Sequence, residues 1–326
     1  MMRRSLAVVL GAVFCVLTVL APSVAAQENY PSRPIRVIVP TAPGGNLDLG
    51  TRDLMREMAT VIGQPVVVEN RPGASLLVGT QFVSKAAPDG YTLLAMSNTF
   101  ATAPHLLTAA GYDPIRDFEG VGQMTISPLM LVVAASSPIT SLQGLVALAR
   151  ERPGQVSYGS AGIGSTSHMA PAMLFLQAGA TALHVPYKGN VPALVDVGAG
   201  RVTFAIAAIS DVAERIKAGR FRALGMATLQ RSPLMPGVPA IAEAGFPGYE
   251  LVAFGGLVAP AGTPREIRAR LHAALARSMT PAVRERWAAN GVEIAGSESP
   301  DQFTAFIRQE TARYGRLVKD LGIKPE

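Results

Sequence analysis

The chain repeats one local pattern: a short apolar stretch rich in β-branched residues, a loop of glycine and small polar residues, and a stretch of helical period. The first copy occupies residues 36–54, in which residues 37–39 are apolar and Gly44 and Gly45 lie in the loop. This order predicts a strand, a tight loop and a helix. Loops at the carboxyl ends of strands line ligand crevices in open α/β sheets, so this loop is a candidate binding element.

The same pattern recurs twice before residue 105. Residues 66–68 and 91–96 are predicted strands, and each precedes a polar loop and a helical segment, the second of which stops near Pro104. Successive units of this kind build a parallel sheet with right-handed crossovers. The three loops are therefore expected on one edge of that sheet.

The pattern restarts after residue 128 and indicates a second α/β unit. Polar loops follow three of its predicted strands, and Asp211 and Glu214 have the spacing of a capping box at the start of its last helix. The expected strands are 129–134, 156–159, 183–186, 202–207 and 223–228, and the expected helices are 142–150, one near Ala193 and one ending near Gly219.

Residues 1–26 have the composition of a cleaved export signal: an arginine pair (Arg3, Arg4), an apolar run and small residues before a polar segment. The apolar run is too short to span a bilayer comfortably, so we expect the mature chain to begin near Gln27. Two alternatives are a twin-arginine signal and a lipoprotein formed at Cys15. The residues after the arginine pair do not complete the first pattern, and more apolar chain follows Cys15.

About 300 residues after this leader exceed what one core usually holds, so two domains are expected. The apolar residues 251–258 return the chain to the first domain, and Thr263 and Ser299, each followed by proline, are predicted helix caps. The expected limits are 27–128 with 250–326 for the first domain and 129–249 for the second. Two crossing segments, near residues 128 and 250, would join them.

Composition excludes several classes of protein. Cys15 is the only cysteine, so disulfides, thiolate catalysis and cysteine-ligated metals are not expected after export. The formal charge of +6 falls to +4 without the arginine pair, and the basic residues between 265 and 316 interleave with acids as on solvated helix faces. We therefore expect no nucleic-acid partner. Trp287 belongs to an apolar helix stripe, and no cofactor is expected.

No reactive constellation of an enzyme is found. Residues 158–162 lack the glycine that a nucleophile elbow needs two places before its serine. The four histidines have no metal-ligand spacing, and the glycine-rich loops match neither dinucleotide nor phosphate-binding motifs. Ser165 and His168 lie one turn apart, but a serine that caps a helix is the commoner arrangement. We expect neither catalytic nor metal-ligating residues.

Glycine, serine, threonine and asparagine recur at helix starts in both predicted domains. Taken singly, such residues reflect turn and cap chemistry. Two facing sets could hold a carboxylate by N–H and O–H groups, helped by the partial positive charge of helix N-termini. Each charge-assisted bond contributes roughly 1.5–3 kcal/mol, and micromolar binding needs about 8 kcal/mol. A few bonds therefore suffice without a buried cation.

Seven motifs together resemble one known family. They are residues 30–35 (YPSRPI), 42–45 (APGG) with Asp48 and Arg52, 70–74 (NRPGA), 88–94 (PDGYTLL), 158–160 (YGS) with Gly162 and 164–165, 184–189 (HVPYKG), and 259–264 (APAGTP). In this order they resemble the Bug family, the extracytoplasmic solute receptors of tripartite tricarboxylate transporters. The resemblance implies a two-domain, type II-like periplasmic-binding-protein fold whose cleft closes on a carboxylated solute.

Transferred position by position, the resemblance implies ligand-binding residues on both domains. The first-domain set is Pro43, Gly44, Gly45, Asp48, Ala74 and Ser97, and the second-domain set is Ser160, Gly164, Ser165, His168 and Asp211. Asp48 is expected to cap its helix, to hold water or to receive an ammonium group, or else to act only as a favourable charge in a first helical turn. Lys188 is a candidate charge at the mouth of the cleft.

Three positions depart from the family pattern. Thr41 replaces a residue that is commonly aromatic, which predicts a roomier or more polar pocket. Ser75 stands where a second glycine is common and adds a hydroxyl group. Pro171 predicts that the helix after Ser165 starts later or kinks.

The favoured function is a monomeric periplasmic receptor, with no enzymatic activity, that captures a di- or tricarboxylate or related organic acid. It would deliver this ligand to the membrane subunits of a tripartite tricarboxylate transporter. One alternative is a carboxylate sensor that reports to a membrane signalling partner, which the sequence does not separate from a transport receptor. The other is a serine hydrolase that uses Ser165 and His168.

Overall fold

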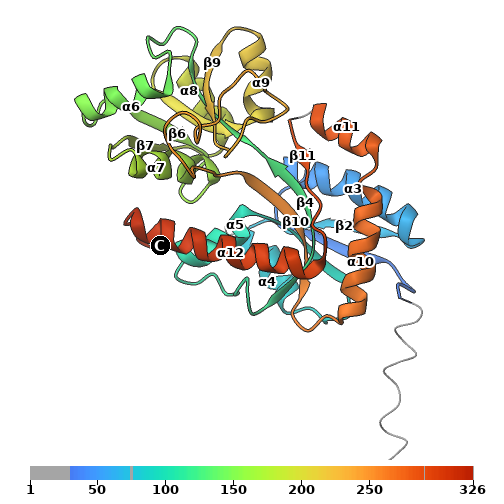
Figure 1. Ribbon diagram of the computed structural model, residues 1–326. Helices are drawn as coiled ribbons and strands as arrows, with labels where there is room; N and C mark the ends of the chain where they lie inside the picture. The colour runs from blue at the N-terminus through green and yellow to red at the C-terminus, as the bar shows by residue number, and fades with distance from the viewer. Residues whose placement is uncertain (1–29, 74–75, 290, 326) are drawn as a thin grey trace, which may run out of the picture.

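The structure is a computed structural model that describes residues 30–73, 76–289 and 291–325 of the 326-residue chain. The predicted leader, with Cys15, and the positions of Ala74 and Ser75 lie outside the described residues. Two β-sheets, each flanked by helices, form an upper and a lower lobe in Figure 1. Within the described part of the chain, no helix is both long and apolar enough to cross a bilayer.

The first lobe is built from both ends of the chain. Its elements are β1 (Ile35–Val39), α3 (Asn46–Ile62), β2 (Val66–Asn70), α4 (Leu77–Ser84), β3 (Thr92–Ser97), α5 (Asn98–Leu106), β4 (Phe118–Ser127), β10 (Ala253–Pro260), α10 (Arg265–Ser278), α11 (Pro281–Ala289), β11 (Glu293–Ile294) and α12 (Pro300–Asp320). The strand order is β11-β4-β10-β3-β1-β2. Strands β1, β2 and β3 pair in parallel, as the repeated strand–loop–helix pattern predicts, and β10 is antiparallel to β3 and β4.

The second lobe is built from the middle of the chain. Its elements are β5 (Leu129–Ala134), α6 (Leu142–Glu151), β6 (Ser157–Ser160), α7 (Thr166–Gln177), β7 (Leu183–Pro186), α8 (Asn190–Gly198), β8 (Phe204–Ala208), α9 (Ile209–Lys217) and β9 (Phe221–Met226). The strand order is β7-β6-β8-β5-β9, with β6 parallel to both β7 and β8. The chain crosses between the lobes twice, from β4 to β5 and from β9 to β10.

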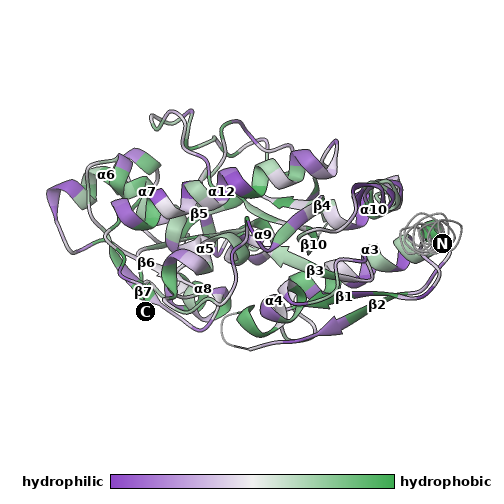
Figure 2. Ribbon diagram, turned by 90° about the horizontal axis from the view of Figure 1, so that it is seen from below, coloured by the Kyte–Doolittle hydropathy of each residue, from purple (hydrophilic) through white to green (hydrophobic). Residues whose placement is uncertain are grey.

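An apolar core continues from one lobe to the other. Phe100 and Leu106 of α5 belong to the same buried cluster as Met169 and Leu174 of α7. The opposite faces of the two sheets have separate clusters, under α3 and α10 in the first lobe and under α8 and α9 in the second. Figure 2 shows the resulting contrast between the apolar strand β3 and the polar helix α10 at the surface.

Some helix starts differ from those expected. Ser299 caps α12 by accepting the Gln302 N–H at 3.1 Å, as predicted. The predicted cap at Thr263 is wrong, because its hydroxyl donates to the Pro260 carbonyl at 2.7 Å and α10 begins only after Pro264. Helix α7 begins directly after Ser165 with Pro171 inside it, so the later start, one of the two predicted alternatives, is wrong.

Strand β4 was not predicted, although it adjoins β10 in the centre of the first sheet. Its sequence, FEGVGQMTIS, interrupts the apolar alternation with glycines. These glycines permit close packing: a Cβ at Gly120 would lie 2.8 Å from the Thr304 amide of α12, and one at Gly122 would lie 2.8 Å from Leu275 of α10. The glycines obscure the strand pattern in the sequence, but because they lack side chains they allow helices to approach both faces of β4.

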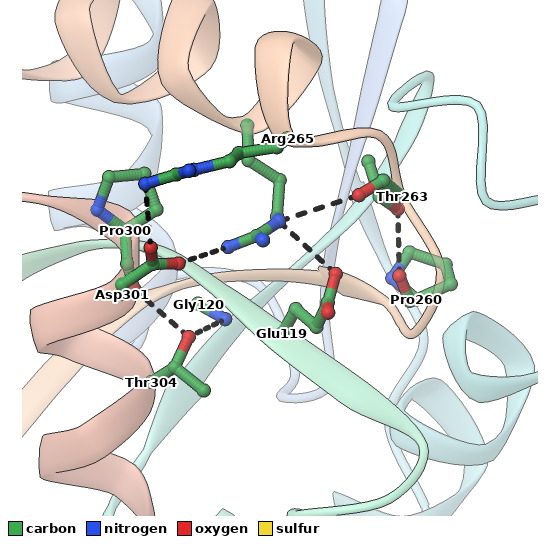
Figure 3. A network of polar contacts seen from close by, with 9 residues as sticks. Glu119, Gly120, Pro260, Thr263, Arg265, Pro300, Asp301 and Thr304 are labelled. Carbon is green, nitrogen blue, oxygen red and sulfur yellow. Dashed lines mark hydrogen bonds and ion pairs between the residues drawn. The ribbon is translucent and has the colours of Figure 1, made fainter.

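An ion network joins α10, β4 and the start of α12 (Figure 3). Arg268, whose side chain is 10% exposed, lies 3.1 Å from Glu119 and 3.1 Å from Asp301. Its Nε also donates to the Thr263 carbonyl at 3.4 Å. Arg265 reaches the same aspartate from the surface, at 3.5 Å and with 82% exposure. The network ties the last helix to the first lobe.

Replacing Arg268 by Met should lower the free energy of unfolding by about 2 kcal/mol, because it leaves Glu119 and Asp301 without their buried partner. Asp301 is 59% exposed and can be hydrated, so the loss of unfolding free energy should be smaller than for a fully buried ion pair. Arg265→Met is the matched control and should change the free energy by less than about 0.5 kcal/mol. Urea denaturation measures both, and equal losses would contradict the assignment.

Candidate functional site

The loops that follow the parallel strands of the first lobe emerge on one edge of its sheet. They are the loop 40–45 between β1 and α3, residues 71–73 after β2, and the direct junction of Ser97 with Asn98 between β3 and α5. The parallel pairing of β1 with β2 and β3 places these carboxyl ends side by side. In an open α/β sheet, this is the edge at which ligands bind.

The second lobe has an equivalent edge. The loop 161–165 links β6 to α7, the loop 187–189 links β7 to α8, and β8 passes directly into α9 at Ala208. Because β6 is parallel to β7 and β8, these three junctions lie together. Helices α7, α8 and α9 therefore all begin on this edge.

The loop edge of the second lobe faces the first lobe (Figure 1). Gly164 touches Leu106 of α5 so closely that a Cβ at Gly164 would overlap the leucine side chain. At a second contact, a Cβ at Gly291 would lie 2.9 Å from both Ile209 Cγ2 and the Ser210 nitrogen, at the start of α9. These two contacts bring the junctions after β6 and β8 against the first lobe.

Asp48 organises the first-lobe loop. Its carboxylate is 1% exposed and accepts three hydrogen bonds of 2.9 Å, from the Gly44 N–H, the Arg52 Nε and the Asn70 Nδ2. Asn70 also donates to the Thr41 carbonyl at 3.0 Å. Burial alone would raise the pKa of Asp48, but these hydrogen bonds hold it below its usual range.

These bonds change the expected roles of two candidates. Asp48 acts as a favourable charge in the first turn of α3, and its carboxylate is already occupied, so the predicted ammonium-binding role is not supported. The Gly44 N–H, expected to meet a ligand, donates to Asp48 instead. Pro43, Gly44 and Gly45 remain exposed in the loop, with Gly44 at a φ of +86°. The amides of Asn46 and Leu47 open α3 and have no acceptor within the helix.

The junction between β3 and α5 is anchored by a residue that the sequence did not single out. Ser97 is half-buried and precedes α5 without a side-chain cap bond. Asn98 is 5% exposed, donates to the Val252 carbonyl at 3.1 Å and to Tyr314 Oη at 2.7 Å, and accepts the Phe254 N–H at 2.7 Å. Asn98 thus fastens the start of α5 to the returning chain and to α12.

Ser165 caps α7, as the sequence predicts. Its Oγ accepts the His168 N–H at 3.2 Å and donates to the Gly162 carbonyl at 2.7 Å. The His168 ring does not approach it as a base would, since its Nδ1 accepts the Gly164 N–H at 3.0 Å. The geometry therefore fits loop construction and does not favour the hydrolase alternative.

His184 was missed as a site residue, yet it lies beside two that were predicted. Its Nε2 is 2.6 Å from Ser160 Oγ, and its ring stacks on that of His168 with 3.9 Å between centroids. Burial lowers the pKa of His184 and lowers that of His168 to about 4, the latter with a contribution from His184. The structure thus brings together Ser160, Gly164, Ser165 and His168, with His184 as an additional member.

Asp211 does not form the predicted capping box with Glu214. Helix α9 begins earlier, at Ile209, with Ala208 in the capping position and no side-chain cap bond. Asp211 instead lies in the first turn and accepts a 2.8 Å bond from Asn190 at the start of α8. Burial raises the pKa of Asp211, although the Asn190 bond opposes this change.

The described residues contain no group of three or more side chains suited to holding a metal ion. Lys188 is exposed in the loop after β7.

Comparison with known proteins identifies the family. The family described as the tripartite tricarboxylate transporter family receptor matches residues 51–323. The chain belongs to this receptor family. A curated relative, BugT of Bordetella pertussis, is 36% identical, and the similarity covers 99% of both chains. The predicted resemblance to the Bug receptors is confirmed.

Solved structures of this receptor family share the fold. The periplasmic binding protein BugD is 31% identical with a TM-score of 0.75, and the match covers 91% of this chain and all of BugD. Rpa4515 of R. palustris, solved with adipate, is 33% identical with a TM-score of 0.79, over 91% of this chain and all of Rpa4515. The predicted two-lobed periplasmic-binding-protein fold is therefore confirmed, and family and neighbours are solute-binding proteins.

Replacing Asp48 by Asn in this receptor should lower the free energy of unfolding by about 1–3 kcal/mol, because an amide cannot accept from Gly44, Arg52 and Asn70 together. Since the folded pKa is depressed, this stabilisation is present above the unfolded pKa of about 3.9 and is lost as pH falls through the folded value. Urea denaturation at neutral pH measures the loss. Asp320→Asn, exposed at the end of α12, is the control and should show none.

Proposed function

We propose that this receptor resides in the periplasm, closes its two lobes on a small di- or tricarboxylate or related organic acid, and delivers it to the membrane subunits of a tripartite tricarboxylate transporter. The observation that carries the proposal is that both loop edges lie at the crossings between the lobes, where Ser97 of β3 pairs with Gly255 and Ala208 of β8 pairs with Leu129. Each edge is lined by the N-termini of helices. Helix N-termini present unpaired amides and partial positive charge to an anion. The adipate in the related structure of Rpa4515 supports the same ligand class.

The ligand carboxylate would be held by the amides that the loops do not use themselves. In the first lobe these belong to the start of α3, because the Gly44 N–H is bonded to Asp48. In the second lobe they belong to the start of α7, because the Gly164 N–H is bonded to His168. Within the described chain, Thr41 Oγ1 of the first-lobe loop is buried without a hydrogen-bond partner and would add a hydroxyl for ligand or bound water.

Function would follow a hinge cycle in a monomer. The moving bodies are the predicted domains, 27–128 with 250–326 and 129–249. A ligand that contacts both lobes binds the closed form more tightly than the open form and so shifts the population towards closure. The two crossing segments would bend while each sheet remains intact.

Ligand binding should stabilise and compact the protein. We expect a thermal shift of several degrees with at least one member of a panel of adipate, malate, citrate and related acids, since ligand at about 100 times its dissociation constant adds about 2.7 kcal/mol. Small-angle scattering of the same mixture should show a smaller radius of gyration. Neither effect across the panel would contradict capture of a carboxylate, and unchanged carboxylate uptake in a deletion strain would contradict delivery to a transporter.

Two variants test the proposed binding groups. Gly44→Val introduces a β-branched residue at positive φ and should weaken binding at least about tenfold by moving the loop. Ser165→Ala removes the cap that shapes the start of α7 and should have a similar effect, with a stability loss of about 1 kcal/mol. Isothermal titration with the best ligand of the panel measures both.

Each variant has a matched control elsewhere in the chain. Gly219→Val places the same strain at an exposed positive-φ glycine after α9, and Ser141→Ala removes an equivalent cap from α6. Both controls should bind ligand as the native protein does. Affinity that is unchanged in Gly44→Val and Ser165→Ala would show that the site lies elsewhere.

A further inference from the structure

His168 and His184 lie face to face beneath the loop 161–165, which we name the second-lobe ligand loop. Their ring planes are inclined by 15° with 3.9 Å between centroids, and the Tyr158 ring lies nearly parallel to both, 5.0 Å from His184 and 6.3 Å from His168. The three rings come from α7, β7 and β6 respectively. The stack therefore joins three elements directly under the loop.

Each histidine holds one part of the second-lobe ligand loop. His184 Nε2 lies 2.6 Å from Ser160 Oγ, which accepts the Gly162 N–H at 3.1 Å. His168 Nδ1 accepts the Gly164 N–H at 3.0 Å. Gly164 is also the residue that touches Leu106 of the first lobe. The rings thus set both the base of the loop and its contact with the opposite lobe.

The geometry requires an uncharged His168. A backbone N–H can donate to a ring nitrogen only when that nitrogen carries no proton, so His168 is the neutral Nε2–H tautomer. A proton on Nδ1 would place two donors against each other and would break the Gly164 bond. It would also put a charge 3.9 Å from the second imidazole.

Among the described residues, the recorded hydrogen-bond and ring-stacking partners of the two imidazoles are uncharged. Strand β6 contributes Ser160 and Tyr158, whose pKa burial raises, and β8 contributes Phe204, which packs on Tyr158 at 5.7 Å. Helix α5 contributes Leu106 beside Gly164, while Lys188, after β7, is exposed. A proton on the stack would therefore find no carboxylate among these neighbours to stabilise it.

We propose that His168 and His184 are positioning residues, which hold the second-lobe ligand loop in its binding form only while the His168 ring is neutral. The inference rests on the proposed function for the claim that the loop binds ligand. The claim that the histidines keep the loop ordered does not depend on that function. The pKa of His168 is lowered to about 4 in the fold. The unfolded value is about 6.5, so a loosened loop binds more protons between these limits. Order of the loop is complete above this window and declines as pH falls through it.

The positioning role can be tested without ligand by amide hydrogen exchange of the full mature chain at neutral pH. His184→Phe keeps a ring in the stack but removes the nitrogen that bonds Ser160, and exchange protection of residues 161–168 should fall at least about tenfold. His272→Phe is the control, because His272 is also half-buried and bonds only to Ser297 of the first lobe among the described residues, at 2.9 Å from its carbonyl and 3.4 Å from its hydroxyl. Unchanged protection in His184→Phe would overturn the proposal.

Proton linkage needs a variant that keeps the hydrogen bonds but cannot be charged. In His168→Asn with His184→Gln, amide groups stand near the positions of Nδ1 and Nε2, and the loop should stay protected at both neutral and acidic pH. Between about pH 7.5 and pH 4.5, the native protein should lose at least about tenfold more protection than this double variant. Equal pH profiles for the two proteins would overturn the neutral-ring requirement.

Adipate titrations over the same pH range connect the loop to binding. The protonation of adipate itself affects both proteins equally, so a steeper acid loss of affinity in the native protein reports the histidines. Equal losses would overturn the link to binding. If the native protein binds no acid of the panel while the exchange results hold, the proposed function fails and the positioning role of the histidines stands.

Discussion

The hydrogen bonding of the backbone N–H groups at the loop edges of the two sheets determines the shape of the candidate site. Parallel strands deliver the starts of their helices to a common edge, and the first turn of each helix has amides without intrahelical acceptors. Here some loop amides are satisfied from within: Gly44 by Asp48 and Gly164 by His168. This internal bonding gives the loops a defined shape. It separates the amides that hold the loops together from those at the helix starts, where we propose that the anion binds.

Most of the fold could be predicted from local sequence. The β-branched runs of β1, β2 and β5 and the helical period of α3 and α12 are strong signals, and their order already indicates two α/β lobes. Strand β4 was not predicted because its glycines interrupt the apolar alternation of a strand. Those glycines allow helices to pack on both of its faces, and such packing cannot be seen in the local sequence. The start of α9 was misplaced because Asp211 has the residue type of a cap but bonds to Asn190, on another helix.

The site was predictable where its bonds are local and was not where they are long-range. Ser165 caps the residue three positions later, a relation that spacing alone can show. His184 lies 24 positions from Ser160, and Asn70 lies 22 positions from Asp48, so only the folded chain reveals either contact. The family resemblance supplied candidate positions, but the structural role of each candidate residue follows from its hydrogen bonds.

Asn98 has a mechanical consequence. Asn98 is the first residue of α5, and its side-chain amide bonds to residues 252 and 254 of the returning chain and to Tyr314 of α12. These segments must therefore turn as one rigid block. In the proposed hinge cycle, the second crossing would therefore bend before Val252, near Glu250. Both residues line one cavity of about 340 Å³ together with Pro128 of the first crossing. Bending in this cycle would thus be confined to a short segment on the second-lobe side of Val252, and the start of α5 would not tilt relative to its own sheet.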